Sequence, residues 1–107
     1  MDAGANVGVF SILCAKLGAK RVLAFEPIEE ICLKLEKNIQ HNSLRNKITV
    51  VNKGLGNEQK RIKIGFDFYE NEAEIVPLDM FLRGRRVDFI KIDVEGFEKE
   101  VILGAKE

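Results

Sequence analysis

The sequence predicts an α/β domain built on a parallel sheet, and three observations point to it. Short apolar runs alternate with longer segments in which apolar residues recur every three or four positions. The runs at 21–25, 47–51 and 87–92 are mostly apolar, which is typical of strands buried on both faces. Because helical segments separate these runs, right-handed crossovers between parallel strands are the expected connections.

The first element is a glycine-rich turn, "DAGANVG" at 2–8, which leads into a helix expected over 8–17, with Gly18 at a C-cap position. The apolar stripe predicted for this helix comprises Val7, Phe10, Leu13, Cys14 and Leu17. Such a turn normally follows a strand, and only Met1 precedes it. We therefore expect the first strand to be nearly absent, so that the second and fourth strands carry unpaired ladder groups that face a gap.

The second strand and helix carry the clearest pattern in the chain. The strand at 21–25 is followed by Glu26 and Pro27, and Pro27 opens a helix expected over 28–42. The buried stripe predicted for this helix comprises Ile28, Ile31, Leu35 and Ile39. A third strand is expected at 47–51.

The segment after the third strand is less regular. Residues 54–59, "GLGNEQ", predict a turn, and "RIKIGF" at 61–66 alternates like a half-exposed strand. Residues 67–75 are acidic, and we expect them to form an irregular loop.

The last third of the chain returns to the strand–helix pattern. A short helix is expected within 77–84, followed by the strand at 87–92 and a final helix over 96–103. The residues of that helix predicted to point inward are Phe97, Val101 and Ile102.

The composition bounds the class of protein. The chain has 107 residues, 46% of them hydrophobic and 32% charged, which fits one ordinary globular domain. Seventeen basic and seventeen acidic residues cancel, which argues against binding to nucleic acid through bulk charge. The basic run at 83–86, "RGRR", is better explained as a solvated loop.

The residue types also indicate a compartment. No apolar run approaches the ~20 residues that span a bilayer, and no signal segment is evident, so we expect a cytoplasmic protein without membrane attachment. Cys14 and Cys32 are far apart and lie among apolar neighbours, which predicts buried thiols in a reducing compartment. His41 is the only histidine, so a His-rich metal site is not expected.

Polar residues and glycines follow the predicted strands, where ligands of parallel sheets bind. Gly4 and Gly8 allow close backbone approach, and the helix after them offers free N–H groups to an anion. Glu26 could accept the two hydroxyls of a ribose, or it could cap the next helix. Asn6 and Val9 stand where the dinucleotide fingerprint needs glycine, which disfavours a pyrophosphate site.

Five segments, in this order and spacing, resemble the FkbM-type methyltransferase family: "DAGANVG", "AFEP", "VNKGLGNE", "PLD" and "IKIDVEGFEKEVILGA". The resemblance implies an S-adenosylmethionine-dependent enzyme with the Rossmann-like, seven-stranded class I methyltransferase sheet. Residues 1–107 would then be a partial, truncated domain, the cofactor-binding half, because the later strands and most of the acceptor pocket are not in it.

The resemblance also implies roles for individual residues. Around the methionine part of the cofactor it places Asp2, Gly4, Ala5, Asn6 and Gly8. Glu26 would take the ribose hydroxyls, Pro27 or the residue after it would flank the adenine, and Asn52 would lie near the adenine edge. Asp93 and Glu95, with Gly96, would border the place where sulfonium and acceptor meet.

The expected activity follows from these roles. Asp93 and Glu95 are the carboxylates available as a base for a hydroxyl acceptor on a small molecule or sugar. Lys91 lies two positions before Asp93 on the same strand face, so the two could form a functional ion pair, or Lys91 could neutralise its neighbours structurally. The alternative to an enzyme is a non-catalytic remnant or binding module.

Overall fold

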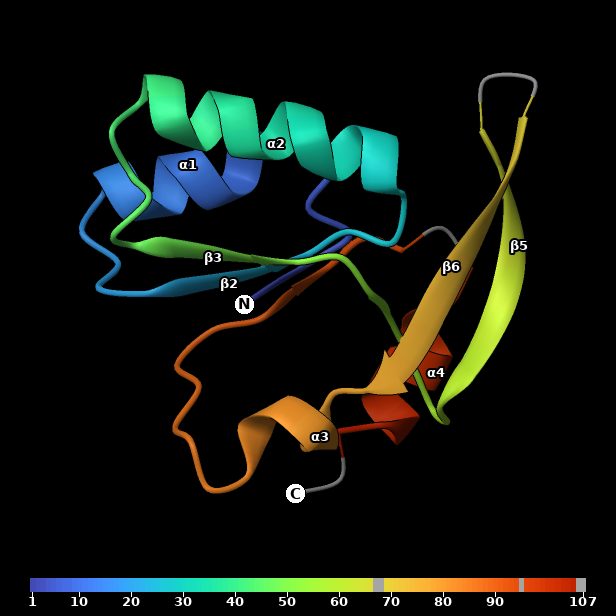
Figure 1. The fold of residues 1–107 in the computed structure, drawn as a ribbon. Helices are drawn as coiled ribbons and strands as arrows, with labels where there is room; N and C mark the ends of the chain where they lie inside the picture. The colour runs from blue at the N-terminus through green and yellow to red at the C-terminus, as the bar shows by residue number, and fades with distance from the viewer. Residues whose placement is uncertain (67–68, 95, 106–107) are drawn as a thin grey trace.

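The computed structural model describes residues 1–66, 69–94 and 96–105, which form two sheets and four helices (Figure 1). The larger sheet is parallel throughout and has the strand order β3-β2-β1-β7. Its strands are β1 (Asp2–Ala3), β2 (Val22–Phe25), β3 (Ile48–Val51) and β7 (Lys91–Ile92). The expected α/β class with parallel strands is confirmed. The predicted strand at 87–92 is confirmed only at its last two residues.

Strand β1 fills the centre of this sheet, so the expected gap between the second and fourth strands is wrong. Asp2 pairs with Ala24 on one side and with Lys91 on the other. The flanking residues lengthen the ladder, because the N–H of Lys91 donates to the Met1 carbonyl at 2.9 Å and that of Asp93 donates to the Ala3 carbonyl at 3.0 Å. Two residues of strand therefore satisfy the backbone groups that a central position exposes.

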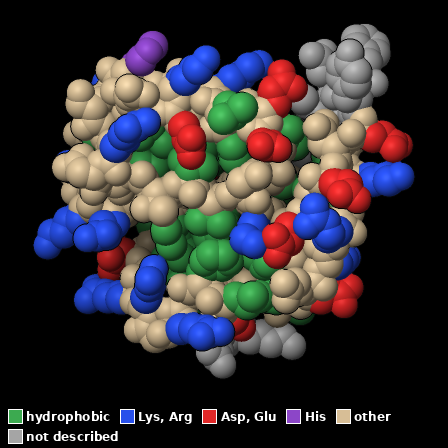
Figure 2. Space-filling model, in the orientation of Figure 1, with side chains coloured by type: hydrophobic (Ala, Val, Ile, Leu, Met, Phe, Trp, Pro, Cys, Tyr) green, Lys and Arg blue, Asp and Glu red, His purple; other side chains and the backbone are tan. Residues whose placement is uncertain are grey.

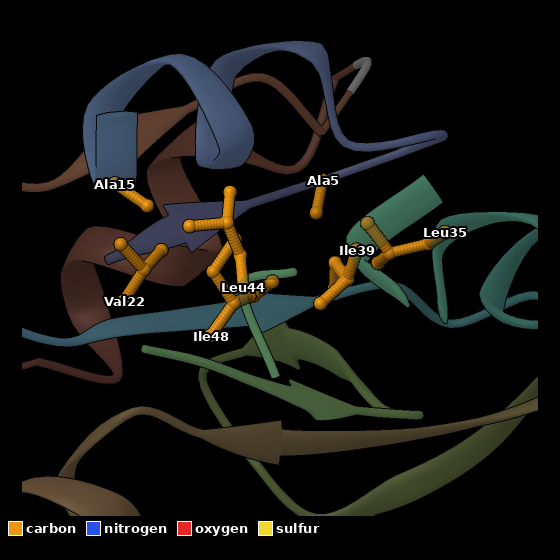
Figure 3. Packing of buried hydrophobic residues seen from close by; sticks show 8 residues of the cluster. Ala5, Ala15, Val22, Leu35, Ile39, Leu44 and Ile48 are labelled. Atoms are coloured by element: carbon orange, nitrogen blue, oxygen red, sulfur yellow. The ribbon is translucent and has the colours of Figure 1, made fainter. Parts of the chain in front are cut away.

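Helices α1 (Val9–Lys16) and α2 (Glu29–His41) both lie on one face of the parallel sheet (Figure 1). The predicted stripe of α2 is confirmed, since Ile31, Leu35 and Ile39 are all buried. Leu35 and Ile39 form a cluster with Leu44 and with residues of the glycine turn, α1 and strands β2 and β3, and its members pack between the helices and the sheet (Figure 3). Burial of this apolar surface is the main favourable term for this half of the molecule.

The predicted stripe of α1 is wrong in phase. Leu13 and Leu17 are 51% and 79% exposed, whereas Ser11 and Ala15 are buried. The hydroxyl of Ser11 donates to the buried carboxylate of Asp2 at 2.6 Å, and this bond holds the helix with its small residues against the sheet. The Ser11–Asp2 hydrogen bond and the close approach of small residues to the sheet thus set the orientation of α1. The spacing of apolar residues in the sequence predicts neither of these contacts.

A second sheet, with the order β4-β6-β5, occupies part of the predicted turn at 54–59 and residues 69–75 of the predicted loop, whereas residues 67 and 68 of that loop lie outside the described part of the chain. Its strands are β4 (Gly54–Gly56), β5 (Lys60–Phe66) and β6 (Tyr69–Pro77). Strands β5 and β6 form an antiparallel hairpin, and β4 pairs with β6 in parallel. The acidic residues that suggested a loop alternate along β6, so they share one exposed face while Ala73 and Ile75 are buried on the other.

Two short helices complete the fold below the parallel sheet: α3 (Asp79–Leu82) and α4 (Glu98–Leu103) (Figure 1). A second apolar cluster joins them to both sheets through Phe25, Val76 and Val101. Val101 is fully buried as predicted, but Ile102 is 62% exposed, so its predicted inward position is wrong. In Figure 2, hydrophobic side chains gather in the middle of the visible face, between the parallel sheet and α3, with charged groups around them.

None of the helices that the structure describes combines the length and the hydropathy needed to cross a membrane.

Gly104 lies where α4 ends against the second sheet, which gives a test of this packing. A Cβ added there would overlap the carbonyl oxygen of Gly56, a backbone atom that cannot turn aside. We expect Gly104→Ala to lower the free energy of unfolding by about 1–3 kcal/mol, the scale of overpacking, as measured by urea denaturation. Gly65→Ala is the matched control, because a Cβ on Gly65 meets no atom. Equal losses in the two variants would contradict this account.

Candidate active site

A cavity of about 960 Å³ lies beyond the carboxyl ends of β1, β2 and β7. The glycine turn after β1 and the start of α1 line one part of it, and the residues after β2 line another. The β5–β6 hairpin lines a third part. The cavity is therefore at the edge of the sheet where the sequence analysis places the ligand, and Gly4, Glu26 and Asp93 all border it.

The glycine turn has a backbone that few residues tolerate. Gly4, Asn6 and Gly8 have φ values of +83°, +53° and +97°, in the left-handed region that favours glycine and admits asparagine. The N–H groups of Gly4 and Ala5 both donate to the Phe25 carbonyl, at 3.0 and 2.9 Å, and bind the turn to the end of β2. A Cβ on Gly4 would overlap the Asp93 carbonyl oxygen, so only glycine permits this approach.

Helix α1 begins at the cavity without a side-chain cap. Gly8 is its N-cap residue, no side chain bonds to its first N–H groups, and its first turn holds no acidic residue. Free N–H groups and the positive end of the helix dipole favour a bound anion. Asn6 and Val7 from the turn line the cavity beside this helix end.

The carboxylate of Glu26 connects two loops at the cavity wall. Its Oε1 accepts the N–H of Asn6 at 3.0 Å, and its Oε2 accepts the N–H of Ile28 at 2.9 Å. Glu26 is only 5% exposed, and burial raises its pKa above the ordinary 4.5. The two backbone bonds oppose that rise, and the nearby negative charge of Asp2 adds to it. Ile28 is the N-cap residue of α2, and no side chain bonds to the first N–H groups of that helix, so the alternative in which Glu26 caps the helix is wrong.

Lys91 lies between two carboxylates. Its Nζ is 3.6 Å from Oδ1 of the fully buried Asp2 and 3.9 Å from Oδ2 of Asp93, whose side chain is 67% exposed. It also lies 5.2 Å from the centre of the Phe10 ring. Within the described part of the chain, Asp2 Oδ1 accepts no hydrogen bond, so this ammonium is its nearest compensating charge. The shorter contact is with Asp2, which agrees with the structural role considered for Lys91.

The other candidate residues lie at different depths. Pro27 lines the cavity, as does Ala5. Asn52 lies behind the wall, where its Nδ2 donates to the carbonyls of Glu26 and Pro27 at 3.0 and 3.2 Å. Gly8 and Asp2 likewise support the wall and are not among its described lining residues. Glu95 lies outside the residues that the structure describes.

Several lining residues escaped the sequence analysis. Phe10, Val94 and Phe97 border the cavity near Asp93, and Ile62 and Ile64 border it from the hairpin. The alternation noted at 61–66 was the available signal for the hairpin residues. Because a loop was predicted at 67–75, the second sheet was not predicted, and this sheet brings Ile62 and Ile64 to the site.

The raised pKa of Glu26 predicts a specific dependence of stability on pH. The folded chain binds the Glu26 proton more tightly than the unfolded chain, so this group's contribution to the free energy of unfolding falls as the pH rises from 4.5 through the raised pKa. Glu26→Gln cannot ionise. We expect the stability of the unaltered chain minus that of Glu26→Gln to decrease between about pH 4 and pH 7 in urea denaturation.

The control for this experiment is Glu36→Gln, which changes an exposed glutamate of α2. Parallel stability curves for the unaltered chain and Glu26→Gln across that pH range would contradict a raised pKa.

Known proteins are similar to this chain in sequence and fold. A family model described as the methyltransferase FkbM domain matches residues 2–107. The crystal structure of methyltransferase FkbM from Methylobacillus flagellatus KT has a TM-score of 0.67 and 28% identity to this chain. That alignment covers 97% of this chain and 28% of that protein.

A shorter stretch is similar to the ribosomal protein L11 methyltransferase of Syntrophomonas wolfei. The two are 47% identical over 51 residues, which make up 47% of this chain and 16% of that protein. This chain spans less than a third of the length of either relative. Since the family model matches almost every residue, the chain belongs to the FkbM methyltransferase family.

Proposed function

We propose that this chain is the cofactor-binding half of an S-adenosylmethionine-dependent methyltransferase that methylates a hydroxyl on a small molecule or sugar. The observation that carries the proposal is the buried Glu26 at the cavity wall, bonded to both the glycine turn and the start of α2. Family membership supports methyl transfer as the reaction class.

The residues of the glycine turn fit the methionine part of such a cofactor. The uncapped N-terminus of α1 offers N–H groups to its carboxylate. Asp2, which the family pattern places near the ammonium of that methionine part, would act from behind the turn by holding Ser11 and Lys91.

The Glu26 carboxylate can accept hydrogen bonds from a ribose in addition to those from Asn6 and Ile28. A carboxylate has about four lone-pair sites, and the two backbone N–H groups occupy one on each oxygen. The remaining lone pairs could accept the vicinal hydroxyls of a ribose at the cavity surface. The two backbone bonds and the ribose role are therefore compatible, and these bonds would fix the carboxylate before the cofactor binds.

When bound, the cofactor supplies a methyl group activated by its sulfonium. The chain's own residues would align the acceptor oxygen and remove its proton. We assign the proton-accepting role to the Asp93 carboxylate, with Lys91 at 3.9 Å compensating its charge. Phe10 and Phe97 line the same part of the cavity and would exclude water from the reacting groups. Glu95 stays a second candidate for the base.

Two alternatives to this activity are less well supported. A non-catalytic remnant would have no need to keep the turn, Glu26 and Asp93 around one cavity. The name of the Syntrophomonas wolfei relative gives a ribosomal protein as its target, but the match covers only 16% of that protein.

Binding of S-adenosylhomocysteine, measured by titration calorimetry on the folded chain, tests the cofactor. We expect binding, and we expect Glu26→Ala to weaken it by about 1–3 kcal/mol, the scale of an unmade hydrogen bond to a charged group. Glu36→Ala, an exposed change of the same kind on α2, should leave the affinity unchanged. A folded chain that does not bind would refute the proposed cofactor, and equal affinities for Glu26→Ala and the unaltered chain would refute the role of Glu26.

Transfer of a radiolabelled methyl group tests the reaction. We expect label to reach a sugar or small hydroxyl compound, and Asp93→Asn to slow that transfer by about 10²-fold or more, as for loss of a general base. Binding of S-adenosylhomocysteine to Asp93→Asn serves as the control for folding. Label found on ribosomal protein L11 and on no hydroxyl compound would overturn the proposed acceptor.

A further inference from the structure

The β5–β6 hairpin has one apolar face and one charged face. Residues 61, 63, 70, 72 and 74 share the outer face, where Arg61 and Glu72 lie 3.5 Å apart. Ile62 and Ile64 share the inner face with Ala73 and Ile75, and both border the cavity. The two isoleucines are only half-buried, although their neighbours Ala73 and Ile75 are buried. The inner face therefore presents unfilled apolar surface to the cavity.

The hairpin is fixed firmly to the rest of the site. Strand β6 pairs with β4 at Ile75, which lies opposite Gly54. A Cβ on Gly54 would lie 2.5 Å from Cδ1 of Ile75 and 3.3 Å from Cβ of Pro27, so the hairpin approaches the residue after Glu26 with only a glycine between them. Lys53 and Glu74 add an ion pair at 2.7 Å.

The cavity lies between this inner face and the residues that follow β2. Figure 1 shows the hairpin standing beside the N-terminal end of α2 and beyond the ends of β2 and β3. Pro27, Ile28 and Ile31 line the cavity from the α2 side, and Ile62, Lys63, Ile64 and Gly65 line it from the hairpin. The polar groups Asn6, Lys91 and Asp93 line the part formed by the turn and β7.

We propose that the hairpin is the second wall of a purine slot, in which Ile62 and Ile64 pack on one face of the adenine and Pro27 and Ile28 pack on the other. This inference rests on the proposed function, in which Glu26 holds the ribose. The base joined to that ribose then lies beside the residues that follow Glu26. A purine is flat and apolar on both faces, so one aliphatic wall on each side can bury those faces.

Substitution of the isoleucines tests the wall. We expect Ile64→Ala and Ile62→Ala each to weaken S-adenosylhomocysteine binding about tenfold, because part of the apolar contact is lost. 5′-Methylthioadenosine, which carries the base and ribose but no amino acid, should lose the same factor. Ile102→Ala makes the same change at a 62% exposed site on α4 that does not line the cavity, and it should leave both affinities unchanged.

The outcomes separate this proposal from the one on which it rests. If the unaltered folded chain binds neither ligand, the proposed cofactor is wrong. If it binds both and the two hairpin variants bind equally well, the hairpin wall is wrong. A loss for S-adenosylhomocysteine alone would place the isoleucines against the amino-acid part and would also overturn the proposal.

A second measurement on the unaltered chain avoids any effect of the substitutions on folding. With ¹³C-labelled isoleucine methyl groups, adenosine should shift the Ile62 and Ile64 methyl resonances through the ring current of the base. The Ile102 methyl resonance should stay in place. Saturating adenosine that leaves the Ile62 and Ile64 resonances unmoved would refute contact with the base.

Discussion

The central strand β1, only two residues long, is the constraint on which the rest of the structure depends. Asp2 and Ala3 pair with β2 on one side and β7 on the other, so they determine the register of both neighbours. The same Asp2 places a buried carboxylate that orients α1 through Ser11 and attracts the ammonium of Lys91. Burying a charge costs free energy unless the charge is paired. The partners of the Asp2 carboxylate, Ser11 of α1 and Lys91 of β7, are therefore held next to it. The glycine turn and the cavity then follow from where β1 ends.

Glu26 forms a second connection, between the loop after β1 and the loop after β2. Its carboxylate is held by backbone N–H groups of Asn6 and Ile28 and is nearly fully buried. Burial raises the pKa of Glu26, which means that the ionised form is less stable in the folded protein than in water. Asn52 reinforces the arrangement from behind by binding the carbonyls of Glu26 and Pro27. The site is thereby organised before any ligand enters, which lowers the ordering cost of binding.

The sequence predicted the parts of the fold that depend on local pattern. The α2 stripe and the runs that became β2 and β3 follow from residue type and spacing. The phase of α1 was missed because a buried Ser11–Asp2 bond decides it. The hairpin was missed because the glutamates of β6 dominate its composition, and their alternation shows only when paired with β5.

For the candidate site, the sequence predicted which residues lie at the cavity but not how deeply each side chain lies. Gly4, Glu26 and Asp93 were placed correctly at the cavity, because the carboxyl ends of parallel strands meet at one edge. The depth of each side chain was not predictable: Asn52 and Asp2 lie behind the wall, and their long-range partners decide this. The isoleucines of the hairpin belong to the site only through the pairing of β6 with β4, a contact between distant segments.

The two sheets line different parts of the cavity. The residues that follow the parallel strands contribute the turn, Glu26 and Asp93, whereas the hairpin contributes Ile62 and Ile64 together with Lys63 and Gly65. Gly54 and Gly56 both belong to β4, and a Cβ on either would overlap the Ile75 side chain. A Cβ on Gly54 would also lie 3.3 Å from Cβ of Pro27, so the glycine at this position lets Ile75 of the hairpin and Pro27 approach each other closely. The contact between the hairpin and the residues after β2 therefore depends on a position that lies between them.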